Sequence, residues 1–156
     1  MLTQSTRHDS FTEFAREVEP RLRRALVAGY GTQKGREAAA DALVYAWRKW
    51  DKVELLDNPA GYLYRVGQRY AKKRRSQAPL FTLPAPTSEP WIEPELPNAL
   101  ARLSTRQRAA VLLHHSFEWT YAEIGELLGL SLSTVRNHCD RGMKKLQSAL
   151  EVPTDG

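Results

Sequence analysis

The sequence predicts an all-α fold, with two small helical domains joined by a proline-rich linker and a helix-turn-helix in the C-terminal domain. Apolar residues recur at helical spacing in both halves of the chain, which is typical of amphipathic helices. Ser, Thr and Asn stand at capping positions in front of several of these helices. Six of the nine prolines fall between Pro79 and Pro97, and proline favours extended chain. We therefore expect domains at residues 1–76 and 101–150, joined by a linker at residues 77–100.

The N-terminal segment predicts a long first helix. Ser10 and Glu13 have the spacing of a capping box, and apolar residues then recur at helical spacing to about Ala28. Pro20 falls inside this helix and should kink or split it, because proline lacks the backbone donor and clashes with the preceding turn. The Gly-Tyr-Gly-Thr sequence of residues 29–32 then predicts a turn.

A second helix is expected at about residues 34–50, with apolar residues on two sides. Leu43 and Trp47 lie on one side, and Val44 and Tyr45 lie on the other. Two interpretations are open. Either one face packs on the first helix while part of the other meets a partner, or the helix has one broad core face.

Asn58 followed by Pro59 predicts the start of a third helix, as an N-cap residue with proline at the first helical position. Six Lys and Arg fall within residues 65–75 with almost no acidic neighbours, which is denser than solubility needs. Three tyrosines interleave with this segment, and single-stranded nucleic acid suits such a surface, since bases stack on rings while the backbone meets charge. The alternatives are a solvated basic face and, for Tyr70, a ring packed in the core.

The linker is acidic as well as proline-rich, since residues 76–100 carry three Glu and no Lys or Arg. An extended acidic segment can lie in a basic channel, and Phe81, Trp91 and Ile92 are candidate anchors to a surface. An inert spacer is the other interpretation.

Three helix starts can be marked in the C-terminal segment. Ser104 with Gln107, and Thr120 with Glu123, have the spacing of a capping box. Ser131 is a third N-cap candidate. Gly129 can end a helix in the left-handed conformation. Two short helices joined by a glycine-containing turn form the outline of a helix-turn-helix.

The last helix has a polar face that suits the DNA major groove. Arg can fork onto guanine, Asn can pair with adenine, and Ser or Thr can contact phosphates or bases. An ordinary helical hairpin with a solvated polar face is the alternative, but caps, turn and apolar stripe in register favour DNA binding. The candidate DNA-reading residues are Ser133, Thr134, Arg136, Asn137, Arg141 and Lys144.

The net charge of +5 is unevenly distributed. Residues 1–75 carry sixteen Lys and Arg against nine Asp and Glu, whereas residues 101–156 carry seven against six. Attraction to phosphate supplies most non-specific DNA affinity. A nearly neutral helix-turn-helix should therefore bind DNA weakly alone and need a second, tethered contact.

The sequence argues against membrane insertion and against catalysis. It has no run of about 18 apolar residues, and its polar start is no signal peptide. The single cysteine, Cys139, cannot form an internal disulfide and fits a core position, so a reducing cytoplasm is the consistent compartment. His114 and His115 are adjacent, should point to different helix faces, and belong to no metal-ligand spacing. We expect no catalytic residue, metal, cofactor or small-molecule substrate.

These motifs together resemble a small bacterial RNA polymerase sigma factor of the extracytoplasmic-function (ECF) group, which has sigma2 and sigma4 domains joined by a linker. The segment from Asn58 to Val66 is similar to the family's Asn-Pro-x-x-Trp-Leu-x-x-Ile pattern, and a basic run follows it. Residues 120–136 are close to the sigma4 helix-turn-helix, and residues 103–108 match its Leu-Pro-x-x-Gln-Arg lead-in. The pairing of both halves is specific, whereas helix-turn-helix modules alone are widely shared.

The resemblance implies partners and roles. Core RNA polymerase and promoter DNA would be partners, and an anti-sigma factor a possible third, although no residue identifies one. The last helix would read the −35 element, and the third helix with the loop before it would recognise and melt the −10 element. The implied −10 residues are Tyr62, Arg65, Gln68, Arg69, Lys72 and Lys73. The implied polymerase contacts, in the second helix, are Asp41, Leu43, Tyr45 and Trp47.

Two other functions remain as alternatives. Residues 132–138 also resemble the reading helix of LuxR-type regulators, which would make the chain a stand-alone regulator of duplex DNA. The second alternative is a polymerase-binding module without initiation activity, because Ala40 stands where the family usually carries Gln in the polymerase-docking helix.

Overall fold

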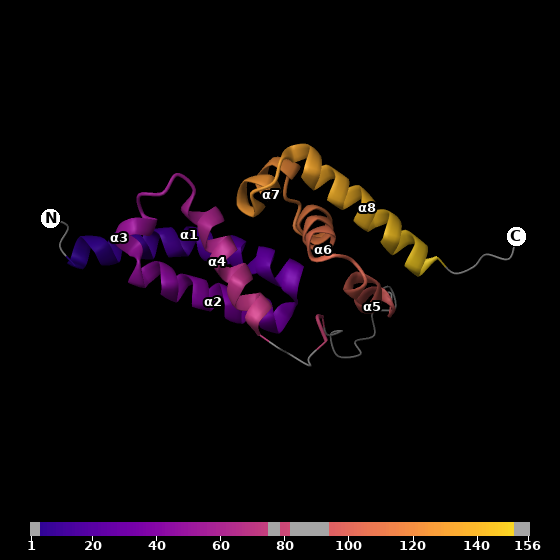
Figure 1. Ribbon diagram of the computed structural model, residues 1–156, viewed down its shortest axis with the longest axis horizontal. Coiled ribbons are helices and arrows are strands. Elements are labelled where there is room, and N and C mark those ends of the chain that lie inside the picture. Colours follow the sequence, from indigo (N-terminus) through magenta and orange to yellow (C-terminus); the bar gives the residue numbers. More distant parts are fainter. Residues whose placement is uncertain (1–3, 75–78, 82–93, 152–156) are drawn as a thin grey trace, which may run out of the picture.

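The computed structural model of the protein describes residues 4–74, 79–81 and 94–151. Within these ranges every regular element is a helix, so the predicted all-α fold is confirmed. The N-terminal helices are α1 (Gln4–Tyr30), α2 (Thr32–Arg48), α3 (Trp50–Val53) and α4 (Pro59–Lys73). The C-terminal helices are α5 (Leu96–Ala101), α6 (Thr105–Val111), a π-helical turn (Leu112–Ser116), α7 (Tyr121–Leu128) and α8 (Leu132–Leu150). In Figure 1 α1, α2 and α4 pack together, and α6 and α7 lie beside them.

The first helix differs from its prediction at both marked residues. It begins at Gln4, so Ser10 is not its cap; the Ser10 hydroxyl instead accepts a hydrogen bond from the indole N–H of Trp50 at 2.8 Å. Pro20 lies inside α1 without splitting it. Tertiary packing outweighs the local signal, because Val18 and Leu22, on either side of the proline, are buried in the core.

The junction between α1 and α2 is tighter than the predicted four-residue turn. Only Gly31 separates the helices, and it has a φ of 95°, which favours glycine. The backbone N–H of Thr32 donates to the carbonyl of Leu80 at 2.9 Å, and Phe81 packs against the core. Part of the predicted linker is thus docked on this corner, whereas the other two candidate anchors lie outside the described residues.

The predicted start of α4 is confirmed. The Asn58 side-chain oxygen accepts a hydrogen bond from the Gly61 N–H at 3.0 Å, and proline occupies the first helical turn. Leu63 and Val66 are buried on the inner side of the helix, against α1 and α2. The basic residues of α4 are left on its outer side.

The predicted caps of the C-terminal helices are also confirmed. Ser104 and Thr120 each form a complete capping box, and the Ser131 hydroxyl accepts a hydrogen bond from the Thr134 N–H at 3.2 Å. Gly129 ends α7 in the left-handed conformation, with a φ of 73°. Residues 120–150 therefore form a helix-turn-helix whose second helix is α8.

The π-helical turn corrects the prediction for the paired histidines. The rings of His114 and His115 lie edge to face with centroids 4.9 Å apart, rather than on separate faces. His114 also stacks on Tyr121, and one of its ring nitrogens lies 2.8 Å from the carbonyl oxygen of Trp119. The wider turn changes the angle between successive side chains, which regular helical spacing does not anticipate.

The N-terminal and C-terminal helices meet at a buried surface, here called the central interface. Arg108 of α6 is 6% exposed, and its guanidinium donates two hydrogen bonds to the carbonyl of Gly29, at 2.6 and 3.2 Å. The same guanidinium donates to the carbonyls of Leu100 and Leu103 at 3.2 and 2.8 Å. One charged side chain therefore satisfies carbonyls from both groups of helices.

Aromatic and polar contacts extend the central interface. The guanidinium carbons of Arg21 and Arg24 lie 5.8 and 5.6 Å from the ring centroids of Trp119 and Phe117. The Asn58 side-chain amide, which caps α4, also donates to a carbonyl of α7 at 3.0 Å. Buried apolar residues of both groups belong to one continuous cluster. None of the described helices combines the length and apolar character that crossing a bilayer requires.

Candidate nucleic-acid interface

The polar face of α8 is open to solvent. Ser133, Arg136, Asn137, Arg141 and Lys144 are exposed, and Thr134 is half-buried. The hydroxyls at the start of the helix are partly occupied by its cap, because the Ser131 hydroxyl donates to that of Thr134 at 2.7 Å. Arg136 and Asn137 are exposed in the turn of the helix that follows this cap.

The turn before α8 is held by close backbone packing. A Cβ atom at Gly125 would lie 2.5 Å from the carbonyl oxygen of Leu130, so only glycine allows this approach. Val135 and Cys139 are buried on the inner side of α8. Burial raises the pKa of the Cys139 thiol, which keeps it protonated as a small core residue. The reading face is therefore carried on a rigid support.

The outer side of α4 is basic. Arg65, Arg69, Lys72 and Lys73 are exposed, which agrees with a surface that meets phosphates. Gln68 behaves differently from the other residues predicted for the −10 element, because its side chain hydrogen-bonds the half-buried Tyr30 and the buried Tyr64. It supports the helix from inside rather than extending the basic surface.

Tyr45 and Tyr62, predicted for two different roles, meet between α2 and α4. Their hydroxyl oxygens lie 3.2 Å apart at hydrogen-bond distance, and their ring centroids are 6.3 Å apart. The hydrogen bond to Tyr45 and burial both raise the pKa of Tyr62, so the Tyr62 hydroxyl stays protonated at neutral pH. Beside them lies an open pocket of about 140 Å³, here called the tyrosine pocket. Its lining residues are Tyr45, Val66, Arg69, Tyr70 and Lys73.

The end of α4 is tied to α2 by an ion-pair cluster. The guanidinium of Arg74 contacts the carboxylate of Asp41 and lies 2.7 Å from that of Glu37. The hydrogen bond to Asp41, together with the charges of both carboxylates, raises the pKa of Arg74. A predicted polymerase contact, Asp41, is thus already paired within the chain.

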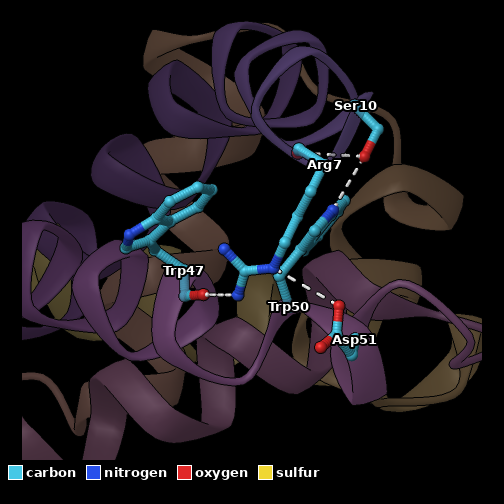
Figure 2. Close-up of polar contacts among 5 residues, drawn as sticks. All are labelled: Arg7, Ser10, Trp47, Trp50 and Asp51. Atoms are coloured by element: carbon cyan, nitrogen blue, oxygen red, sulfur yellow. Dashed lines mark hydrogen bonds and ion pairs between the residues drawn. The ribbon is translucent and has the colours of Figure 1, made fainter. Parts of the chain in front are cut away.

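Trp47, another predicted polymerase contact, is held by α1. Figure 2 shows Arg7 lying between Trp47, Trp50 and Asp51. The Arg7 guanidinium carbon is 4.1 Å from the Trp47 ring centroid, and its nitrogens donate to the Trp47 carbonyl at 2.5 Å and to Asp51 at 3.3 Å. Trp47 is still 36% exposed and neighbouring Val44 is 49% exposed. Leu43, on the same helix, is half-buried against the core.

Sequence reasoning missed the roles of three arginines. Arg7, Arg74 and Arg108 all bind groups 33 or more residues away, which are Trp47, Asp51, Asp41, Glu37 and Gly29. A partial signal existed for Arg74, since Glu37 and Asp41 stand four residues apart on one helix face and invite a shared cation. Nothing in local sequence points to a glycine carbonyl as the partner of Arg108.

Among the residues that the structure describes, no group of three or more His, Cys, Asp and Glu side chains is placed to hold a metal ion. The features that carry chemistry are the helix-turn-helix with its exposed reading face and the basic, tyrosine-bearing α4. They define a DNA-binding protein of the helix-turn-helix class.

Comparison with known proteins narrows this class. Residues 94–146 match the sequence model of the family described as "Sigma-70, region 4". The fold is similar to that of the sigma factor RpoE from Bartonella quintana, solved in complex with the anti-sigma factor NepR. That similarity has a TM-score of 0.60 and 21% sequence identity, and covers 92% of this chain and 98% of RpoE. No curated protein matches the chain in sequence. The family match thus covers the helix-turn-helix part of the chain, and the structural similarity shows a shared fold.

Proposed function

We propose that the chain is an ECF-type sigma factor, which binds core RNA polymerase in the cytoplasm and directs promoter recognition, DNA melting and transcription initiation. The observation that carries the proposal is the exposed polar face of α8 within the segment, residues 94–146, that matches sigma-70 region 4. The helices α1 to α4 would form the sigma2-like part, at residues 1–76, and residues 77–100 the linker, whose last residues begin α5 and overlap the region 4 match.

The proposed −35 contacts lie on α8. Arg136 and Asn137 would read base edges, while Arg141 and Lys144, further along the exposed face, would meet phosphates. Ser133 and Thr134 stand at the helix start, where small hydroxyls contact phosphate or base. The short polar side chains there allow the helix end to approach the groove closely.

The proposed −10 contacts lie on α4 and the loop before it. Arg65, Arg69, Lys72 and Lys73 would hold the phosphates of the melted strand, and Tyr62 would offer a ring to its bases. Gln68 would act indirectly, through its hydrogen bonds to Tyr30 and the buried Tyr64.

The proposed polymerase contacts lie on α2. The partly exposed Trp47 and its neighbour Val44 form an apolar patch near the end of the helix. Apolar side chains grouped on a surface often mark a binding site for another protein. Leu43 would support the patch, and Asp41 and Tyr45 would contribute polar groups beside it. Each contact to DNA or polymerase should be weak alone. Bound to the polymerase, the DNA-binding faces would be held near the promoter at a high effective concentration, which would give one tight complex.

In vitro transcription tests the proposal. Purified core polymerase and the protein are incubated with pooled genomic promoter fragments, and the 5′ ends of new transcripts are sequenced. Start sites that share two spaced elements are expected, and they should be lost when Arg136 and Asn137 are both changed to Ala. A matched double variant of two exposed residues about three turns further along α8, Gln147→Ala with Ser148→Ala, should keep them.

Two results would overturn the proposal and identify the alternatives. Stable core binding without initiation at any fragment would indicate a polymerase-binding module. Retention on duplex DNA without core binding would indicate a stand-alone regulator, which commonly binds as a dimer to a near-palindromic site.

A further inference from the structure

We propose that Arg7 is a positioning residue for polymerase binding, which fixes the ring of Trp47 in the orientation that core RNA polymerase contacts. The inference deepens the proposed function and rests on it, because that function assigns Trp47 to the polymerase contacts. Arg7 lies on α1, outside the helix that carries those contacts. It would act through the Trp47 ring and not through a contact of its own with the polymerase.

Arg7 holds both the ring and the backbone of Trp47. Its guanidinium carbon lies 4.1 Å from the ring centroid, and a guanidinium nitrogen donates to the Trp47 carbonyl at 2.5 Å (Figure 2). That carbonyl belongs to the last turn of α2, where a cation also interacts favourably with the helix dipole. A planar guanidinium can stack on the ring and donate at its edge at the same time, which an ammonium group cannot.

The ion pair with Asp51 adds little to this arrangement. Its nitrogen and oxygen atoms lie 3.3 Å apart, but the Asp51 side chain is 80% exposed, and water screens an ion pair at such a site. The Arg7 side chain itself is only 22% exposed. The stack on the ring and the bond to the carbonyl are therefore the contacts that hold Trp47.

Two further residues of α1 enclose the ring. Phe11 packs against it with centroids 5.2 Å apart, and His8 meets it edge to face with centroids 6.1 Å apart. Trp47 remains partly exposed in spite of these neighbours. A tryptophan that is held by its surroundings and still open on one side is typical of an anchor in a protein–protein interface. Because the ring is ordered before the partner arrives, binding costs less side-chain entropy.

A double-mutant cycle on binding to core polymerase tests the inference. Purified core polymerase is immobilised, and the full-length protein is titrated over it to obtain the dissociation constant. Trp47→Ala should weaken binding by about tenfold or more. Arg7→Met keeps an aliphatic stem and should weaken binding about fivefold. In the Trp47→Ala chain, Arg7→Met should cause no further loss, because the ring that Arg7 positions is already absent.

Two more variants separate positioning from charge. Arg7→Lys keeps the positive charge but loses the planar group, so it should bind core polymerase as weakly as Arg7→Met. It also provides the test if Arg7→Met fails to fold. Arg16→Met removes an exposed cation further along α1 and should bind like the wild type.

Three results would overturn the inference. Wild-type affinity in Arg7→Met would show that the ring needs no positioning by Arg7. Equal losses from Arg7→Met in the wild-type and Trp47→Ala chains would show that Arg7 acts independently of the ring. Wild-type affinity in Arg7→Lys would assign the effect to charge alone. Failure of the proposed function is distinguishable, because the wild type itself would then not bind core polymerase, and the inference would fall with it.

Discussion

The guanidinium of Arg108 lies within hydrogen-bond distance of the Gly29 carbonyl, although the two residues are 79 positions apart in the chain. The contact is buried, and burial lowers the pKa of the guanidinium without bringing deprotonation near neutral pH. The same side chain also satisfies two carbonyls at the start of the C-terminal helices, so its loss should affect both sides of the central interface.

We expect Arg108→Met to destabilise the fold by about 3 kcal/mol, because it removes charge-assisted hydrogen bonds and leaves buried carbonyls without a donor. Urea denaturation measures the change. Arg106→Met is the matched control, since Arg106 is exposed on the same helix, and it should alter stability by less than about 0.5 kcal/mol. Similar losses in the two variants would refute the role of the buried guanidinium.

Gly35→Ala should destabilise the packing of α1 on α2 by about 1–3 kcal/mol. A Cβ atom at this position would lie 2.4 Å from the backbone nitrogen of Val27, and backbone atoms cannot move aside as a flexible side chain can. Thermal denaturation would show a lower melting temperature. Arg36→Ala, at the exposed neighbouring position, should melt close to the wild type. Equal melting temperatures for the two variants would show that position 35 does not require glycine.

The cap of α7 should make stability sensitive to acid. The Thr120 backbone N–H donates to the Glu123 carboxylate at 3.0 Å, and this bond, together with the Thr120 hydroxyl, lowers the pKa of Glu123. A lowered folded-state pKa means that the carboxylate stabilises the fold above its ordinary pKa of about 4.5. That contribution is lost as pH falls through the lower folded-state value.

Melting curves at neutral pH and at about pH 3 test this expectation. The wild type should lose more stability on acidification than Glu123→Gln, whose amide oxygen can still accept the bond at either pH. Glu126→Gln, on the same helix, should follow the wild type. A parallel acid response in Glu123→Gln and the wild type would contradict the assignment.

Substitutions on the exposed polar face of α8 and on the basic face of α4 should weaken DNA binding in different ways. Arg136→Ala should cost about 1–3 kcal/mol at its own base pair and relax sequence preference there, because a forked contact to one base is lost. Lys72→Ala should weaken all sequences alike and reduce the slope of log affinity against log salt by about 1. Binding of the holoenzyme to a set of single-base promoter variants at several salt concentrations separates the two. Uniform losses for Arg136→Ala would remove it from the reading set.

Local chemistry was predictable from the sequence. Asn58, Ser104, Thr120 and Ser131 all cap helices as expected, because a cap needs only a few consecutive residues and the right spacing. Ser10 has the same local signal and failed, since its hydroxyl accepts a hydrogen bond from an indole 40 residues away. A short-range pattern cannot tell which hydroxyl a distant element will use.

The shape of the candidate site was less predictable, because it depends on which helices become neighbours. The separate patterns of α2 and α4 place Tyr45 and Tyr70 on apolar or mixed faces, but only their packing creates a pocket between them. The pairing of Arg74 with Asp41 has the same origin. Single site residues can be predicted from the pattern of one helix. Which of them lie next to each other can be known only from how the helices pack.

The central interface limits how far apart α4 and α8 can lie. The promoter elements that the proposed function assigns to α4 and α8 lie about 25 base pairs apart, which is about 85 Å of straight B-form DNA. In this structure the start of α4 is hydrogen-bonded to α7 through Asn58 and Glu126, and α7 leads directly into α8. The two faces proposed to bind DNA are therefore held too close together to occupy both elements. A chain that reads a whole promoter in the proposed way must therefore uncouple its halves first, and the contacts of the central interface, Arg108 among them, oppose that step.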